Sequence, residues 1–169
     1  MKKRKTSFDK GDGLFHPNYG AGIIIAVQKQ QIEGIERRYY SIELVNDHGT
    51  LMIPVEKADE SGLRLAIRDP KVIAKVLAGQ PQPLDDDHRK RQTELTNKIR
   101  SGEPKQVTEV LRDLAWRGQD GTLTERDKKL QAEAENLLAG ELALRPDFDI
   151  DSATARLSAM VNEAVTHYS

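Results

Sequence analysis

The spacing of hydrophobic residues changes near residue 68. Before that point, apolar residues form short runs rich in β-branched side chains, and glycine, proline and asparagine separate the runs. This pattern is typical of β-strands joined by turns. From Asp69 onward, apolar residues recur at every third or fourth position, which predicts amphipathic helices. The change of period predicts two modules with separate functions.

The first module contains five apolar runs between turn signals. They cover residues 14–15, 23–32, 36–45, 50–54 and 63–67. Glu33-Gly34 is a two-residue turn of the kind that joins the strands of a hairpin. Five short strands in about 60 residues are too few for an ordinary two-layer sandwich. We therefore expect a strongly bent sheet that closes into a small Tudor- or SH3-like barrel.

The second module contains about five amphipathic segments, each with a start signal. The signals are Asp69-Pro70, Asp85-Asp86-Asp87, Pro104, Thr124 with Asp127 as a capping box, and residues 149–152. Because each helix has an apolar stripe that the other helices must cover, we expect a compact bundle.

The predicted fold class is therefore α+β, with an N-terminal Tudor/SH3-like barrel followed by an all-α bundle of about five helices. We expect a flexible basic tail over residues 1–7, the barrel over 8–68 and the helical module over 69–169. No heptad seam predicts a coiled-coil dimer, so we expect a monomer.

Composition excludes several functional classes. The chain has no cysteine, which excludes disulfides and thiolate chemistry. Its four histidines lack the spacing of metal ligands, so we expect no metal and no cofactor; they are His16, His48, His88 and His167. No apolar stretch approaches the length of a membrane span, and no apolar core of a signal peptide follows the basic residues 2–5. These features predict a cytoplasmic protein.

Signatures of catalysis are weak. Gly20-Ala21-Gly22 is followed by a strand pattern and no lysine, so it does not resemble a nucleotide-binding loop. The three adjacent aspartates at 85–87 point in different directions at a helix start, which makes them a poor acid–base pair. We therefore expect no enzymatic activity.

The charge pattern restricts how the chain could bind nucleic acid. The net charge is −1, with 11 Lys and Arg against 9 Asp and Glu in residues 1–68, and 15 against 18 in 69–169. Any contact with nucleic acid must therefore come from a local patch. The strongest candidate patch is His88-Arg89-Lys90-Arg91, which Lys128 and Lys129 could extend. These cations either face water on a helix whose dipole matches the preceding aspartates, or they bind phosphates without reading bases.

Met52, Ile53 and Pro54 form an apolar strand end that also has two interpretations. In one, they contribute to the barrel core and proline blunts an edge. In the other, the edge accepts a strand from a partner protein, with Met52 as an adaptable apolar contact.

Trp116, the only tryptophan, lies away from the apolar stripe of its helix. Either the loop over residues 119–123 covers it, or it is an exposed ring beside Arg112 and Arg117 that could stack on or wedge into a partner.

Several stretches in a fixed order resemble the CarD/CdnL family of bacterial transcription regulators. They are Phe8, Gly11-Asp12, His16-Pro17, Gly20, Gly22, and residues 51–55, 62–64, 110–114 and 138–144. The resemblance implies a Tudor-like domain that adds a strand to the β subunit of RNA polymerase. It also implies a helical domain that contacts promoter DNA at the upstream edge of the melted region and stabilises the open complex.

The resemblance also assigns residues to the two contacts. It places Gln30, Met52 and Pro54 at the polymerase, and Lys90, Arg91 and Lys128 at DNA phosphates. Together with the rest of the basic patch, the predicted DNA-binding residues are His88, Arg89, Lys90, Arg91, Lys128 and Lys129. His88 stands where many members have a tryptophan that wedges into the minor groove, so wedging should be weaker here. Gln30 and Met52 stand where some members have arginines, which suggests a more apolar and less salt-sensitive contact.

Two functional hypotheses follow. In the first, the chain is a non-catalytic transcription regulator, associated with the nucleoid through RNA polymerase, that binds the β subunit and contacts the minor groove and backbone of promoter DNA. Binding to DNA alone should be weak and independent of sequence, because the patch is small. In the second, the chain is a protein-interaction adaptor that does not contact DNA.

Overall fold

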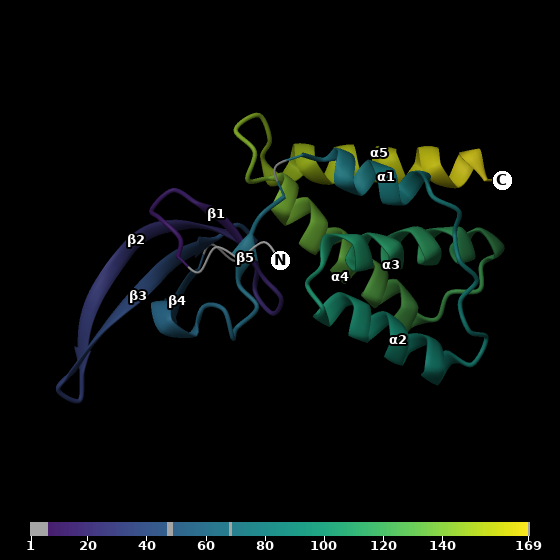
Figure 1. Ribbon diagram of the computed structural model, residues 1–169. Helices are drawn as coiled ribbons and strands as arrows, with labels where there is room; N and C mark the ends of the chain where they lie inside the picture. Colours follow the sequence, from purple (N-terminus) through teal and green to yellow (C-terminus); the bar gives the residue numbers. More distant parts are fainter. Residues whose placement is uncertain (1–6, 47–48, 68, 169) are drawn as a thin grey trace, which may run out of the picture.

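A computed structural model describes residues 7–46, 49–67 and 69–168. Its N-terminal part is a five-stranded antiparallel sheet with strand order β4-β3-β2-β1-β5 (Figure 1). The strands are β1 (Gly13–His16), β2 (Gly20–Ile32), β3 (Ile35–Leu44), β4 (Thr50–Pro54) and β5 (Arg64–Leu65). Most of the predicted basic tail and residues 47–48 of a predicted turn lie outside the described residues.

Alternating side chains of the sheet form the first hydrophobic core. Tyr40, Ile42 and Leu44 point inward from β3 and pack with Ile24 and Phe8, as the period of two requires. Phe8 closes this core, since its ring meets the Tyr40 ring edge-on at 5.8 Å between centroids and its N–H donates to the Tyr40 hydroxyl at 3.0 Å.

Gly22 is required where β2 passes close to β3. A Cβ at this position would lie 2.6 Å from Ile42 Cγ2 and 2.7 Å from the Glu43 carbonyl oxygen. Both distances are shorter than side chains tolerate, so only glycine allows the two backbones this approach.

The β2–β3 hairpin extends well beyond the rest of the sheet (Figure 1). Its turn is Glu33-Gly34, and both residues have positive φ, of 53° and 76° respectively. This conformation matches the two-residue turn predicted from the sequence. The turn sets a register in which Ile32 lies opposite Ile35, and Gln30 lies opposite Arg37.

Five helices form the C-terminal part, as predicted. They are α1 (Lys71–Ala78), α2 (His88–Arg100), α3 (Pro104–Arg117), α4 (Glu125–Leu142) and α5 (Ile150–His167). Two short 3₁₀ turns lie in the connections: η1 (Val55–Lys57) between β4 and β5, and η2 (Gly118–Asp120) between α3 and α4. α1 and α5 pack on one side of α3 and α4, and α2 lies on the other side (Figure 1). The predicted capping box of Thr124 and Asp127 is present at the start of α4.

Arg64 joins the sheet to the bundle. Its guanidinium, stacked over the Phe15 ring at 4.4 Å, donates to both carboxylate oxygens of Glu141 on α4, at 2.6 and 3.1 Å. It also donates to the carbonyl of Gly102, in the loop between α2 and α3, at 2.9 and 3.2 Å. Glu141 further accepts the N–H of Ile67 at 2.8 Å and is only 1% exposed. These contacts fix the orientation of α2 relative to the sheet.

β5 is shorter than the run predicted over 63–67. Arg64 and Leu65 pair with β1, and a last hydrogen bond runs from the Ala66 N–H to the Gly13 carbonyl at 2.9 Å. The N–H of Ile67 has turned away from the sheet to the Glu141 carboxylate, so the strand ends where the connection to the bundle begins.

Candidate functional site

The start of α2 presents three of the predicted DNA-binding residues to solvent. Asp87 caps the helix, and its carboxylate accepts the N–H groups of Arg89 and Lys90 at 2.9 and 3.3 Å. His88, Arg89 and Lys90 are all exposed. This part of the patch combines a fixed backbone with cations that are free to meet a phosphate.

Arg91 corrects the predicted set, because it is buried. Its side chain is 2% exposed and forms two hydrogen bonds with Asp127 of α4, Nη2 to Oδ2 at 2.9 Å and Nε to Oδ1 at 3.2 Å. Nη1 also donates to the carbonyls of Asp85 and Asp86. A guanidinium held by four acceptors in the interior cannot reach a DNA phosphate, so Arg91 fastens α2 to α4.

Arg91 also governs the electrostatics of Asp127. Burial alone would raise the pKa of this carboxyl, but hydrogen bonds from Arg91 and Thr124, together with the Arg91 charge, lower the pKa below its ordinary value of 3.8. Asp127 is therefore ionised near neutral pH, as a buried partner of a guanidinium must be.

The sequence prediction missed two arginines beside the patch. A shallow groove runs along the outer face of α2 to the start of α4; its lining residues are Arg89, Gln92, Thr93, Thr96, Asn97, Arg100 and Arg126. The groove has cations, amides and hydroxyls and no carboxylate, a composition that favours phosphate and sugar oxygens. Arg89, Thr93, Thr96 and Arg100 are spaced by three or four residues, and this helical spacing could have revealed them as one face.

Lys128 and Lys129 lie on the first turns of α4, next to Arg126, and both are exposed. The Lys128 ammonium lies 3.2 Å from Glu125 Oε1, an exposed ion pair that partly neutralises it.

The predicted polymerase-binding residues share the outer face of the sheet. Directly paired residues of antiparallel strands lie on the same side of a sheet. Met52 pairs with Ser41 and Pro54 with Tyr39, both in the outward series of β3 that also includes Arg37, the partner of Gln30. Met52 is 37% exposed, whereas the intervening Ile53 is 6% exposed and belongs to the core.

β4 is an edge strand in the described part of the chain. It pairs with β3 on one side, and no described strand occupies the other. The apolar end of β4 is compatible with both interpretations drawn from the sequence: Ile53 contributes to the core, and Met52 lies on a strand whose second edge no described strand occupies.

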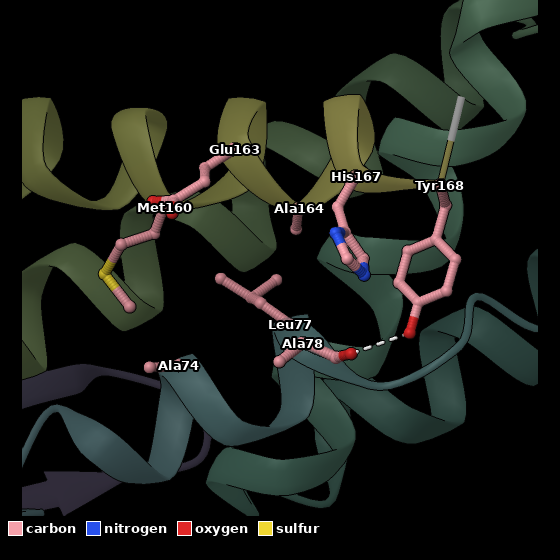
Figure 2. Close-up of a pocket in the computed structure, with 8 residues that line it drawn as sticks. All are labelled: Ala74, Leu77, Ala78, Met160, Glu163, Ala164, His167 and Tyr168. Atoms are coloured by element: carbon pink, nitrogen blue, oxygen red, sulfur yellow. Dashed lines mark hydrogen bonds between the residues drawn. The ribbon is translucent and has the colours of Figure 1, made fainter.

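Trp116 is half-buried, and Tyr168 after the last helix packs against it. The two rings meet edge-on with centroids 6.4 Å apart. Figure 2 shows Tyr168 donating its hydroxyl to the carbonyl of Ala78, at 2.8 Å, at the end of a cleft between α1 and α5. This cleft, of about 330 Å³, is lined mainly by Leu77, Met160, alanines and His167, and lies across the bundle from α2.

The described residues contain no group of three or more histidine, aspartate or glutamate side chains that could hold a metal ion. None of their helices is long and apolar enough to cross a membrane.

Comparison with known proteins assigns both halves to one family. The family model described as "CarD-like/TRCF RID domain" matches residues 8–67, and the model described as "CarD, C-terminal domain" matches residues 72–158. YdeB, a proposed transcription factor of Bacillus subtilis (strain 168), is 29% identical over 138 residues, which cover 80% of this chain and 90% of YdeB. With two domain models matched in order along the same fold, the chain belongs to the CarD family of transcription regulators.

Proposed function

We propose that the chain is a non-catalytic transcription regulator that binds the β subunit of RNA polymerase through its sheet and contacts promoter DNA through its bundle. Residues 8–68 form the polymerase-binding module and residues 69–169 the DNA-contacting module, in a monomer that acts on the nucleoid. The contact with DNA lies near the upstream edge of the melted region and prolongs the life of the open complex.

The free edge of β4 is the observation that carries this proposal. Its backbone groups can pair with a strand of a partner protein, and Met52 offers an apolar side chain beside that edge. The match of residues 8–67 to the CarD-like/TRCF RID domain supports RNA polymerase as the partner.

The groove on α2 supports the contact with DNA. Its three arginines, together with His88, Lys90, Lys128 and Lys129, form the proposed phosphate-binding surface. The arginines and lysines of this surface lie on a protein of net charge −1, so free DNA should bind weakly and with strong salt dependence. Attachment through the sheet raises the local concentration of DNA around the groove and makes a small patch effective.

The first experiment tests the polymerase contact. Purified RNA polymerase is captured with the wild-type chain and with Met52→Asp, which places a charge beside the β4 edge. Val72→Asp is the matched control, because Val72 is similarly exposed, at 43%, on α1. Loss of the β subunit in Met52→Asp alone supports the proposal, and capture by all three proteins contradicts it.

The second experiment separates the regulator from the adaptor. Arg89→Glu with Lys90→Glu reverses two charges of the patch and leaves the sheet unchanged. We expect a shorter open-complex lifetime with polymerase capture intact. An unchanged lifetime would favour an adaptor without contact to DNA.

A further inference from the structure

The outer part of the β2–β3 hairpin projects beyond the other elements of the described residues (Figure 1). Beyond the pair of Tyr39 and Pro54, β2 and β3 continue through four more residue pairs with no third strand beside them in the described residues. Figure 1 shows this end of the hairpin projecting away from both the sheet and the bundle. An isolated two-stranded ribbon is marginally stable in water, so its length calls for a functional reason.

The tip of the hairpin exposes two large apolar side chains. Ile32 and Ile35 are directly paired and are 50% and 56% exposed. A pair of isoleucines exposed beside the turn of a hairpin is unfavourable in water, and it becomes favourable when a partner covers it.

These isoleucines lie on the same face as the proposed polymerase contact. Successive pairs along antiparallel strands alternate between the two faces of a sheet. The pairs of Ile32 with Ile35, Gln30 with Arg37, and Tyr39 with Pro54 therefore lie on the outer face, in line with Met52. We call these seven residues the outer strip.

Arg37 is the only cation of the outer strip. In the part of the chain that the structure describes, it forms no ion pair and no side-chain hydrogen bond, and it is exposed. The adjacent Arg38 lies on the opposite face with Lys29, its direct partner. Lys29 in turn forms an ion pair with Glu36 at 3.5 Å, so that face carries a carboxylate, whereas the outer strip carries none.

β4 alone offers too little contact for a stable complex. It has five residues, and Pro54 at its end has no N–H to donate. Stable protein interfaces bury about 800 Å² on each partner, which is more than a short edge strand supplies. The outer strip extends the same surface in the direction of the strands.

We propose that the partner which pairs with β4 also runs along the outer strip, presenting a carboxylate to Arg37 and an apolar recess to Ile32 and Ile35. This inference rests on the proposed binding of RNA polymerase and names further determinants of it. Arg37 then supplies, from β3, a cationic contact that Gln30 on β2 cannot make.

The test compares two adjacent arginines in the full chain. Affinity for purified core RNA polymerase is measured for the wild type, Arg37→Glu and the matched control Arg38→Glu, with Ile32→Ser/Ile35→Ser as a further variant. Arg37→Glu is expected to weaken binding about tenfold or more. The difference in affinity between this variant and the wild type should shrink as the salt concentration rises. Arg38→Glu should change affinity by less than about threefold, and the serine variant should weaken binding without a change in salt dependence.

Met52→Asp separates the two levels of the proposal. If Met52→Asp abolishes binding while Arg37→Glu and the serine variant bind like the wild type, the hairpin part of the outer strip, which contains Arg37, Ile32 and Ile35, is not part of the interface. Equal losses of affinity in Arg37→Glu and Arg38→Glu would also overturn the proposal. Such losses would reflect the change in net charge and not a contact made by the outer strip. If Met52→Asp and Arg37→Glu both bind normally, the polymerase contact itself is refuted. Far-ultraviolet circular dichroism of each variant confirms that the sheet is intact.

Discussion

Replacement of Arg91 should destabilise the bundle and should not remove a contact with DNA directly. Arg91→Met keeps most of the apolar stem and deletes the guanidinium that binds Asp127. Asp127 is fully buried, so the substitution leaves a carboxylate without its charged partner in the interior. That carboxylate must either stay unpaired or take up a proton, and both outcomes disfavour the folded state.

The size of the effect follows from the geometry of the pair. Breaking a buried ion pair by removing one partner costs about 3–5 kcal/mol. For a chain of this length, each kcal/mol lowers the midpoint of thermal unfolding by about 2–4 °C, so Arg91→Met should unfold about 6–20 °C below the wild type. Asp127→Ala should lose still more, because Asp127 also completes the capping box of α4, which contributes about 1 kcal/mol.

Thermal and urea unfolding measure these losses, with Lys90→Met as the control. Lys90 is exposed and neighbours Arg91 on α2, so its replacement should change stability by less than about 0.5 kcal/mol. The double variant Arg91→Met/Asp127→Ala should lose less than the two single losses combined, because the second change removes the orphaned charge. An Arg91→Met protein that unfolds at the wild-type temperature yet fails to prolong open complexes would show that Arg91 is a surface contact after all.

Three other changes test separate parts of the structure. Gly22→Ala should destabilise the sheet by about 1–3 kcal/mol, because its Cβ would overlap the backbone of β3; wild-type urea unfolding in this variant would contradict the packing. Glu141→Gln weakens the two hydrogen bonds with Arg64 and should broaden the distribution of sheet-to-bundle distances measured by fluorescence energy transfer. An unchanged distribution would mean that other contacts fix the orientation of the sheet relative to the bundle. Burial lowers the pKa of His16 from 6.5, and its Nδ1 accepts the N–H of Asn18 at 3.1 Å. The folded state therefore binds fewer protons than the unfolded state, and the stability present above pH 6.5 is lost as the pH falls through the lowered folded pKa. Urea unfolding at about pH 7.5 and about pH 5 should show this loss in the wild type and a smaller one in His16→Gln; equal losses would exclude His16 as the source.

Local signals allowed much of the fold to be predicted from the sequence. The capping box at Thr124 and the turn at Glu33-Gly34 depend on residues within a few positions of each other, and both are present. The helical bundle followed from apolar periodicity, which reports directly on which face of a helix is buried. The short β5 was less predictable, because its end is set by Glu141, 74 residues away from Ile67.

The candidate site shows the same division between local and distant determinants. Arg91 lies in a basic run, and nothing near it in the sequence indicates that Asp127, 36 residues later, will bury it. Its position in line with Leu95 and Ile99, the buried face of α2, was the one local sign. Arg37 could have been found, because a two-residue turn at Glu33-Gly34 places it opposite Gln30.

The contact between Arg64 and Glu141 limits how this chain can be recombined with its relatives. The sequence divides cleanly near residue 68, which suggests that either half could be exchanged as a unit. However, Arg64 belongs to one half, and Glu141 and the Gly102 carbonyl belong to the other. A chimera that joins the sheet of another family member to this bundle should therefore keep a fixed geometry only if the incoming sheet also carries an arginine at the position of Arg64.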